Sequence, residues 1–127
     1  MNKKHGLILF AHGSRDPRWA EPFEAIAASA RRQRTEVPVR VAFLERMSPD
    51  LAVAAAELVR EGCSAVEVLP VFLGAGGHLQ RDLPPLVQAL REAHPGVAFA
   101  LHGAAGEAPA VIEALAGLVP GGGLARG

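Results

Sequence analysis

Four short runs of apolar residues recur along the chain, and glycine, proline or charged residues follow each of them within a few positions. Runs of this length that are rich in valine, leucine and phenylalanine are typical of β-strands. The longer segments that follow them place apolar residues at helical spacing. The pattern therefore predicts strands at residues 7–10, 39–44, 65–72 and 97–101, and helices at residues 17–34, 48–62, 82–93 and 108–119.

Residue types at the segment boundaries support these helices. Ser48 precedes a proline and an aspartate, which indicates a helix start, because the hydroxyl can cap the first turn and the proline has no N–H to leave unpaired there. Gly62 is typical of a helix end. Asp16 and Asp82 are interpreted as N-caps or first-turn acids, with no role in chemistry.

The strict alternation of strands and helices predicts a parallel sheet with helices on both faces. Right-handed crossovers then favour the strand order 2-1-3-4, as in flavodoxin-like folds. A phenylalanine falls late in each strand, and we assign all four to the core: Phe10, Phe43, Phe72 and Phe99. We expect one three-layer α/β domain over residues 1–119. The glycine-rich tail, residues 120–127, has little to bury and is expected to be disordered.

Composition excludes several classes of function. Thirteen Lys and Arg residues balance thirteen Asp and Glu residues, so no net positive field attracts nucleic acid or an anionic membrane. The apolar run at the start is too short for a signal peptide or a membrane span. The single cysteine, Cys63, has no internal disulfide partner and is expected to be buried and inert. These features predict a cytoplasmic protein that binds neither nucleic acid nor membrane.

Two histidines and a glutamate lie near the ends of three strands that a parallel sheet brings to one edge. His12 follows the first strand, Glu45 follows the second, and His78 lies in the loop after the third. In the order 2-1-3-4, open sheets bind ligands between strands one and three. Each imidazole adjoins glycine, which leaves space for a bulky ligand. Neutral imidazoles with one carboxylate suit Co²⁺, Ni²⁺, Fe²⁺ or Zn²⁺. The sequence therefore predicts a weak divalent-metal site with open positions.

Each of these residues also has an ordinary explanation. A histidine after a strand is often a loop hydrogen-bonding group, and Glu45 could face solvent or pair with Arg46. His102 follows the fourth strand on the same edge and is a secondary candidate, whereas His5 and His94 lie at the wrong ends of their elements. The three loops also carry arginines that could bind acidic groups or cap helices: Arg15, Arg46 and Arg81.

Three segments together resemble the short form of sirohydrochlorin cobaltochelatase, a class II chelatase: FAHGSR at residues 10–15, FLE at 43–45, and PVFLGAGGH at 70–78 with Arg81-Asp82. The resemblance spans about residues 6–119. It implies insertion of a divalent ion into sirohydrochlorin, an acidic tetrapyrrole, in cobalamin or sirohaem biosynthesis. Co²⁺ is the expected ion, Ni²⁺ and Fe²⁺ are alternatives, and ATP is not required.

The resemblance also implies roles for individual residues. His12 and His78 match the two active-site histidines of the family, which bind the incoming metal and help to remove pyrrole protons. Glu45 matches its acidic position and assists metal or proton transfer. Activity is then expected to fall as the pH decreases and the imidazoles take up protons. Ser14, Arg15 and Arg81 become candidates for binding the substrate.

Longer relatives place two such domains on either side of the tetrapyrrole. A macrocycle is too broad for the edge of one four-stranded sheet to enclose, so a homodimer is expected here. The segment LHGAAG at residues 101–106 departs from the Pro-Leu-Gly type of turn found in relatives, and no contact is transferred from it.

Two other functions fit parts of the pattern. A phosphoryl-transfer enzyme could use His12 as nucleophile and Arg15 as phosphate clamp, although Ala11 stands where histidine phosphatases usually have an arginine. A non-catalytic metal carrier could use the same two histidines. Insertion of metal into a tetrapyrrole by the pure protein would exclude the carrier.

Overall fold

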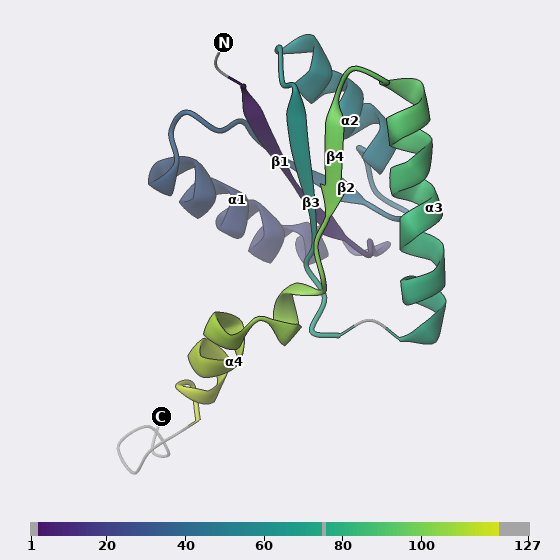
Figure 1. The fold of residues 1–127 in the computed structure, drawn as a ribbon. Helices are drawn as coiled ribbons and strands as arrows, with labels where there is room; N and C mark the ends of the chain where they lie inside the picture. The colour runs from purple at the N-terminus through teal and green to yellow at the C-terminus, as the bar shows by residue number, and fades with distance from the viewer. Residues whose placement is uncertain (1–2, 75, 120–127) are drawn as a thin grey trace.

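The computed structural model describes residues 3–74 and 76–119, and its centre is a four-stranded parallel sheet (Figure 1). The strand order is β2-β1-β3-β4, so the predicted order 2-1-3-4 is confirmed. The strands are β1 (His5–Ala11), β2 (Val39–Phe43), β3 (Ala65–Pro70) and β4 (Ala98–Leu101). Ala11 pairs with Phe43, and Phe10 with Pro70. The carboxyl ends of β1, β2 and β3 are therefore nearly level.

Helices cover both faces of the sheet, as the alternating pattern predicts. Helix α1 packs on one face, and α2 and α3 pack on the other. Helix α4 is different, because it packs on the short helix η2 and extends beyond the carboxyl ends of the strands (Figure 1). The helices are η1 (Pro17–Ala20), α1 (Glu21–Gln33), α2 (Leu51–Arg60), α3 (Gly77–Ala93), η2 (Ala105–Glu107) and α4 (Pro109–Ala116).

The central strand β1 joins two hydrophobic clusters, because side chains of a strand point alternately to the two faces. Ile8 and Phe10 belong to the cluster under α2 and α3, whereas Leu9 and Ala11 belong to the cluster under α1. Burial on both faces explains the continuous apolar run of this strand. Phe10, Phe43 and Phe99 are buried as predicted, and the fourth phenylalanine, after the end of β3, is partly buried against the larger cluster.

Two helix starts differ from the prediction. Helix α3 begins at Gly77, five residues earlier than expected, so Asp82 lies inside the helix and is not its N-cap. Helix α2 is capped by Asp50, whose carboxylate accepts a hydrogen bond from the Val53 N–H at 2.9 Å. The prediction that Ser48 caps this helix is therefore wrong. The physical reason is that the carboxylate of Asp50, two residues later, reaches an N–H that would otherwise be unpaired.

Other boundary predictions are confirmed. Asp16 caps η1 by accepting a hydrogen bond from the Arg18 N–H at 3.0 Å. Gly62 follows α2 with a φ of +96°, the left-handed conformation that glycine adopts without strain. The single domain over residues 1–119 stays a prediction, and the predicted tail at 120–127 lies outside the described residues.

Cys63 is buried between the sheet and α2, as predicted. Burial raises the pKa of its thiol, and the positive charges of Lys4 and Arg40 partly oppose that shift. Throughout the described part of the chain, no helix is both long and apolar enough to pass through a lipid bilayer.

Candidate active site at the carboxyl edge of the sheet

Backbone hydrogen bonds hold the loops after β1 and β2 together beyond the ends of the strands. The Leu44 N–H donates to the Ala11 carbonyl at 2.9 Å, and the Glu45 N–H donates to the His12 carbonyl at 3.0 Å. The paired residues of the sheet end at Ala11 and Phe43, and these two bonds join the segments directly beyond them. They place the side chains of His12 and Glu45 side by side at the carboxyl edge.

Gly13 permits this close approach of the two loops. Its φ is +108°, which strains any residue with a Cβ. A Cβ at this position would also lie 1.8 Å from the Glu45 carbonyl oxygen. Both observations make glycine necessary next to His12, so the glycine that the sequence places there shapes the site itself.

His12 and Glu45 form the polar pair of the site. The His12 Nε2 lies 3.5 Å from the Glu45 Oε2, and the two side chains are 47% and 51% exposed. The Phe72 ring stands at an angle to the imidazole, with ring centroids 6.4 Å apart. Because both side chains are half exposed to solvent, an imidazole and a carboxyl group are available here to bind a metal ion or exchange a proton.

Two arginines add positive charge beside this pair. Arg15 and Arg46 line a shallow hollow of about 490 Å³ together with Gly13 and Ser14. The Arg46 Nε lies 3.4 Å from the Glu45 Oε2, and its φ of 68° is left-handed. The Ser14 hydroxyl accepts a hydrogen bond from a backbone N–H two residues later at 3.1 Å. The hollow can therefore bind anionic groups next to His12.

His78 lies apart from this pair. The sequence predicted it in a loop, but the structure places it in the first turn of α3, where it is exposed together with Arg81. Within residues 3–74 and 76–119, no three His, Cys, Asp or Glu side chains gather closely enough to hold a metal ion. The structure therefore brings together His12 and Glu45 of the predicted ligands, and leaves out His78.

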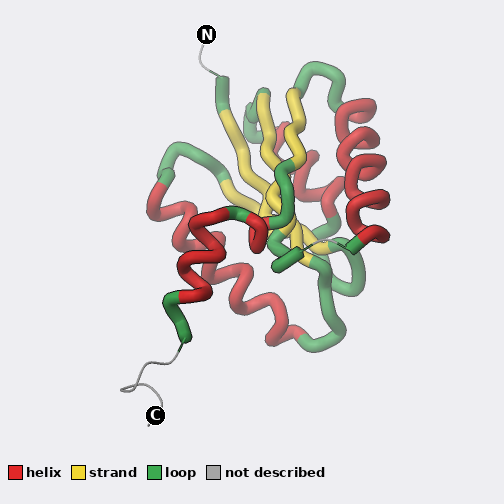
Figure 2. Tube along the Cα trace, turned by 60° about the horizontal axis from the view of Figure 1, so that its bottom comes forward, coloured by secondary structure: helices red, strands yellow, loops and turns green. Residues whose placement is uncertain are grey.

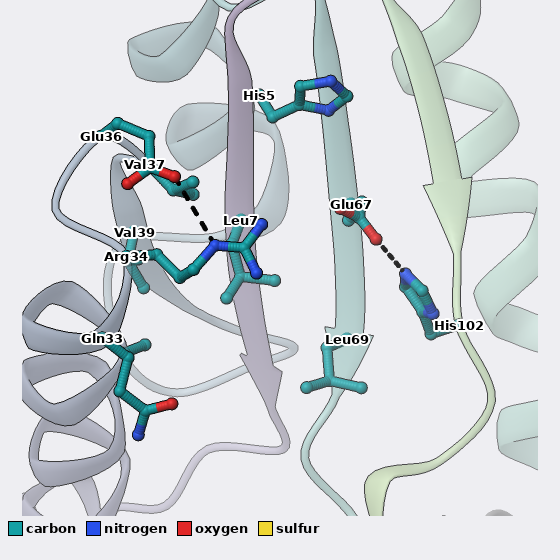
Figure 3. A pocket seen from close by; sticks show the side chains of 11 residues that line it. His5, Leu7, Gln33, Arg34, Glu36, Val37, Val39, Glu67, Leu69 and His102 are labelled. Carbon is teal, nitrogen blue, oxygen red and sulfur yellow. Dashed lines mark hydrogen bonds and ion pairs between the residues drawn. The ribbon is translucent and has the colours of Figure 1, made fainter.

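His102, the secondary candidate, faces a different part of the molecule. Its Nε2 lies 2.6 Å from the Glu67 Oε1 on β3, within a hollow on the sheet face that α1 partly covers (Figure 3). Glu67 was not among the site residues predicted from the sequence. The sequence does contain a signal for it. Glu67 is a charged residue between Val66 and Val68 in a strand expected to be buried on both faces, and such a charge indicates that one face of the sheet is open at this strand.

Comparison with known proteins is consistent with the fold and the edge motifs. The sequence model of the CbiX family matches residues 6–119. A sirohydrochlorin cobaltochelatase from Methanosarcina acetivorans is 32% identical over 87 residues, which are 68% of this chain and 67% of that protein. Another from Methanothermobacter thermautotrophicus is 37% identical over 84 residues, 66% of this chain and 58% of that protein.

Solved structures show the same architecture. A CbiX protein from Marinobacter aquaeolei VT8 is 33% identical, has a TM-score of 0.80, and aligns over 91% of this chain and 93% of its own. The chelatase SirB from Bacillus subtilis subspecies spizizenii, in complex with cobalt, has a TM-score of 0.67 at 22% identity, over 80% of this chain and 43% of its own. The second likeness concerns the fold alone. From the match over residues 6–119 and the shared fold, this chain belongs to the CbiX family.

Proposed function

We propose that this chain inserts a divalent metal ion, Co²⁺ in the first place, into sirohydrochlorin. The observation that carries the proposal is the exposed pair of His12 and Glu45, 3.5 Å apart at the carboxyl edge, in a chain of the CbiX family. Relatives that are 32% and 37% identical to it over 87 and 84 aligned residues are sirohydrochlorin cobaltochelatases. The metal is a substrate of this reaction, and Ni²⁺ or Fe²⁺ could take its place because imidazole and carboxylate suit all three ions.

The reaction requires metal delivery and removal of protons at the same place. As the ion enters the macrocycle, two pyrrole N–H groups each lose a proton, and the metal–nitrogen bonds form. His12 in its neutral form donates its Nε2 lone pair to the ion or accepts one pyrrole proton, Glu45 or His78 accepts the other, and both protons then pass to solvent. An open and incomplete set of ligands favours release of the metal to the macrocycle.

His78 is proposed as the second imidazole of the reaction. Its side chain is exposed in the first turn of α3, so it is accessible to a bound macrocycle. Arg15, Arg81 and Ser14 are proposed to bind the carboxylates of the substrate, because arginine forms paired hydrogen bonds with carboxylates. Arg15 lines the shallow hollow together with Gly13, the residue that follows His12 in the sequence.

The active form is proposed to be a cytoplasmic homodimer that works without ATP. One sheet edge covers one side of a flat macrocycle, and a second copy would supply the opposite wall. Binding energy between the protein and the substrate carboxylates would then hold the macrocycle while the ion enters.

The test is a spectrophotometric metallation assay with purified protein, sirohydrochlorin and Co²⁺, Ni²⁺ or Fe²⁺ in turn. His12→Ala and Glu45→Gln are expected to lower the initial rate at least about tenfold each, and His78→Ala at least about tenfold, in line with the loss of an acid–base group or ligand. His94→Ala is the matched control, because His94 lies at the opposite edge, beyond the end of α3.

Two outcomes would contradict the proposal. If His12→Ala and His78→Ala both metallate the substrate as fast as the parent, the catalytic assignment is wrong. If the parent protein binds Co²⁺ but does not accelerate metallation above the rate without protein, the chain is a metal carrier instead.

A further inference from the structure

The carboxylate of Glu45 is in contact with two groups at once. Its Oε2 lies 3.5 Å from the His12 Nε2 and 3.4 Å from the Arg46 Nε. The three residues belong to loops at the carboxyl edge of the sheet, which Figure 2 turns toward the viewer with its loops in green. One carboxylate oxygen is therefore shared between the imidazole that is proposed to hold the metal ion and a permanently charged guanidinium.

A metal ion and Arg46 compete for this oxygen. The separation of 3.5 Å between the His12 Nε2 and the Glu45 Oε2 leaves room for an ion about 2.1 Å from each atom, the usual ligand distance of a divalent ion such as Zn²⁺. The guanidinium beside the same oxygen repels the ion, because both are positive, and it neutralises part of the charge of the carboxylate. In the chain without substrate, Arg46 therefore weakens the metal site.

The backbone holds Arg46 in this position. Adjacent side chains of an extended segment point to opposite faces, whereas Arg46 has a left-handed φ of 68° and contacts the side chain that precedes it. The Phe43 N–H donates to the Pro49 carbonyl at 2.9 Å, and Met47 packs on the hydrophobic cluster under α1. The loop is thus fixed on both sides of Arg46, so a change of partner requires movement of the side chain alone.

The Arg46 side chain can reach a second kind of partner. It is 43% exposed and lines the shallow hollow together with Arg15. It contacts Glu45 through Nε at 3.4 Å, and among the residues that the structure describes its two terminal NH₂ groups take part in no hydrogen bond. A long, half-exposed ion pair of this kind contributes little free energy. A carboxylate that meets the guanidinium with two parallel hydrogen bonds is held more strongly, so a carboxylate in the hollow can take Arg46 from Glu45.

We propose that Arg46 is a positioning residue that makes metal binding depend on the tetrapyrrole. In the free chain its guanidinium pairs with Glu45 and keeps the metal affinity of His12 and Glu45 low. When a substrate carboxylate enters the hollow, the guanidinium pairs with that carboxylate and releases Glu45 to the ion. The tetrapyrrole thus binds before the ion is held. The inference rests on the proposed function for the identity of the carboxylate, and it adds an order of binding.

Arg15 provides a matched comparison. Both arginines line the same hollow, but no hydrogen bond or ion pair within residues 3–74 and 76–119 joins Arg15 to Glu45. Loss of either arginine removes one positive charge from the hollow, and only loss of Arg46 frees the carboxylate. The difference between the two variants therefore separates competition for Glu45 from the effect of overall charge.

The first test measures Co²⁺ binding to the full-length protein without tetrapyrrole, by isothermal titration calorimetry. Arg46→Gln is expected to bind Co²⁺ at least about fivefold more tightly than the parent, since a positive charge next to the ion is lost. Arg15→Gln is expected to change the affinity by about twofold or less, because its charge acts through screened solvent. In a Glu45→Gln background, Arg46→Gln should have the same small effect. A variant that merely disturbed the loop would weaken Co²⁺ binding, which is the opposite direction.

The second test is the metallation assay at steady state, with each substrate varied in turn. Arg46→Gln should raise the KM for sirohydrochlorin at least about tenfold, because the charged partner of its carboxylate is lost. The KM for Co²⁺ should not rise. Arg15→Gln should also raise the KM for sirohydrochlorin. A loss of folding or of catalytic geometry lowers kcat and does not separate the two KM values in this way.

Four results would overturn the inference: Co²⁺ binding by Arg46→Gln that is no tighter than in the parent, an equal gain in Arg15→Gln, a gain that persists with Glu45→Gln, or a KM for Co²⁺ that rises together with that for sirohydrochlorin. Failure of the proposed function is a separate result. If the parent does not metallate sirohydrochlorin, that function is wrong and the tetrapyrrole has no place in the inference. The Co²⁺ affinities are measured without tetrapyrrole and decide independently whether Arg46 competes with the ion for Glu45.

Discussion

Replacing Gly13 by alanine tests whether the close contact of two loops builds the candidate site. Comparing three glycines separates the cost of backbone strain from the cost of a steric clash. Gly13 has a φ of +108° and a Cβ there would lie 1.8 Å from the Glu45 carbonyl oxygen; Gly62 has a φ of +96° with nothing within 4 Å; Gly96 has neither a positive φ nor a neighbour. The Gly62→Ala variant therefore measures backbone strain alone, and Gly96→Ala is the neutral control.

The expected free energies of unfolding follow from these geometries. A non-glycine residue in the left-handed region costs about 1–2 kcal/mol, so Gly62→Ala should lose about 1 kcal/mol after the reduced entropy of the unfolded chain is counted. In Gly13→Ala the loops must also separate, which breaks the Glu45 N–H bond to the His12 carbonyl at 3.0 Å and costs roughly another 1–2 kcal/mol. We expect a total loss of about 2–3 kcal/mol for Gly13→Ala.

Urea denaturation followed by circular dichroism measures these differences, and the metallation assay measures their effect on the site. The Gly13→Ala variant should lose most of its activity even where it remains folded, because separation of the loops moves His12 away from Glu45. If Gly13→Ala is no less stable than Gly62→Ala, the contact between the loops does not matter. If it keeps full activity, the spacing of the two side chains is not what the reaction requires.

Two further predictions concern the scaffold. Asp50→Ala should lower the free energy of unfolding by about 1 kcal/mol through loss of the α2 cap, whereas Ser48→Ala should change it by less than about 0.5 kcal/mol; equal effects in urea denaturation would show that the cap is misassigned. The Cys63 thiol should react with Ellman's reagent at pH 8 at least about tenfold more slowly in the native than in the unfolded protein, because burial raises its pKa. The same shift means that the unfolded chain releases this proton more readily, so stability should decrease as the pH rises above the ordinary pKa of a thiol.

The sequence predicted the sheet well because its physical signals agree with one another. Each strand is a short apolar run, and in β1 the run is continuous because Leu9 and Phe10 are buried on opposite faces. The alternation of elements and the handedness of crossovers then leave few possible strand orders. The positions of His12 and Glu45 could be predicted from the ends of two neighbouring parallel strands alone. Backbone hydrogen bonds just beyond those ends bring the two residues together.

The position of His78 could not be predicted in the same way. Pro84 and Pro85 lie inside α3, and since proline removes an N–H from the helix ladder, the sequence favours a helix start close to them. A further turn nevertheless forms before them, in which the Gln80 N–H donates to the Gly76 carbonyl at 3.0 Å. The helix therefore extends back to Gly77, and the predicted loop histidine becomes a helical one.

The departure of α4 from the sheet also had no local signal. Its apolar spacing predicts a helix but does not say which part of the molecule the helix packs on. What places the helix is the anchoring of η2, in which the Gly106 N–H donates to the Phe72 carbonyl at 2.8 Å, and this anchoring depends on contacts between segments far apart in the sequence.

The contact between the loops after β1 and β2 makes the spacing of residues 12 and 45 independent of which side chains stand there. The two hydrogen bonds that fix their spacing involve main-chain atoms only, so exchange of either side chain leaves the spacing intact. Substitution at position 12 or 45 can therefore change which metal ion the site prefers while the backbone that positions these residues stays the same.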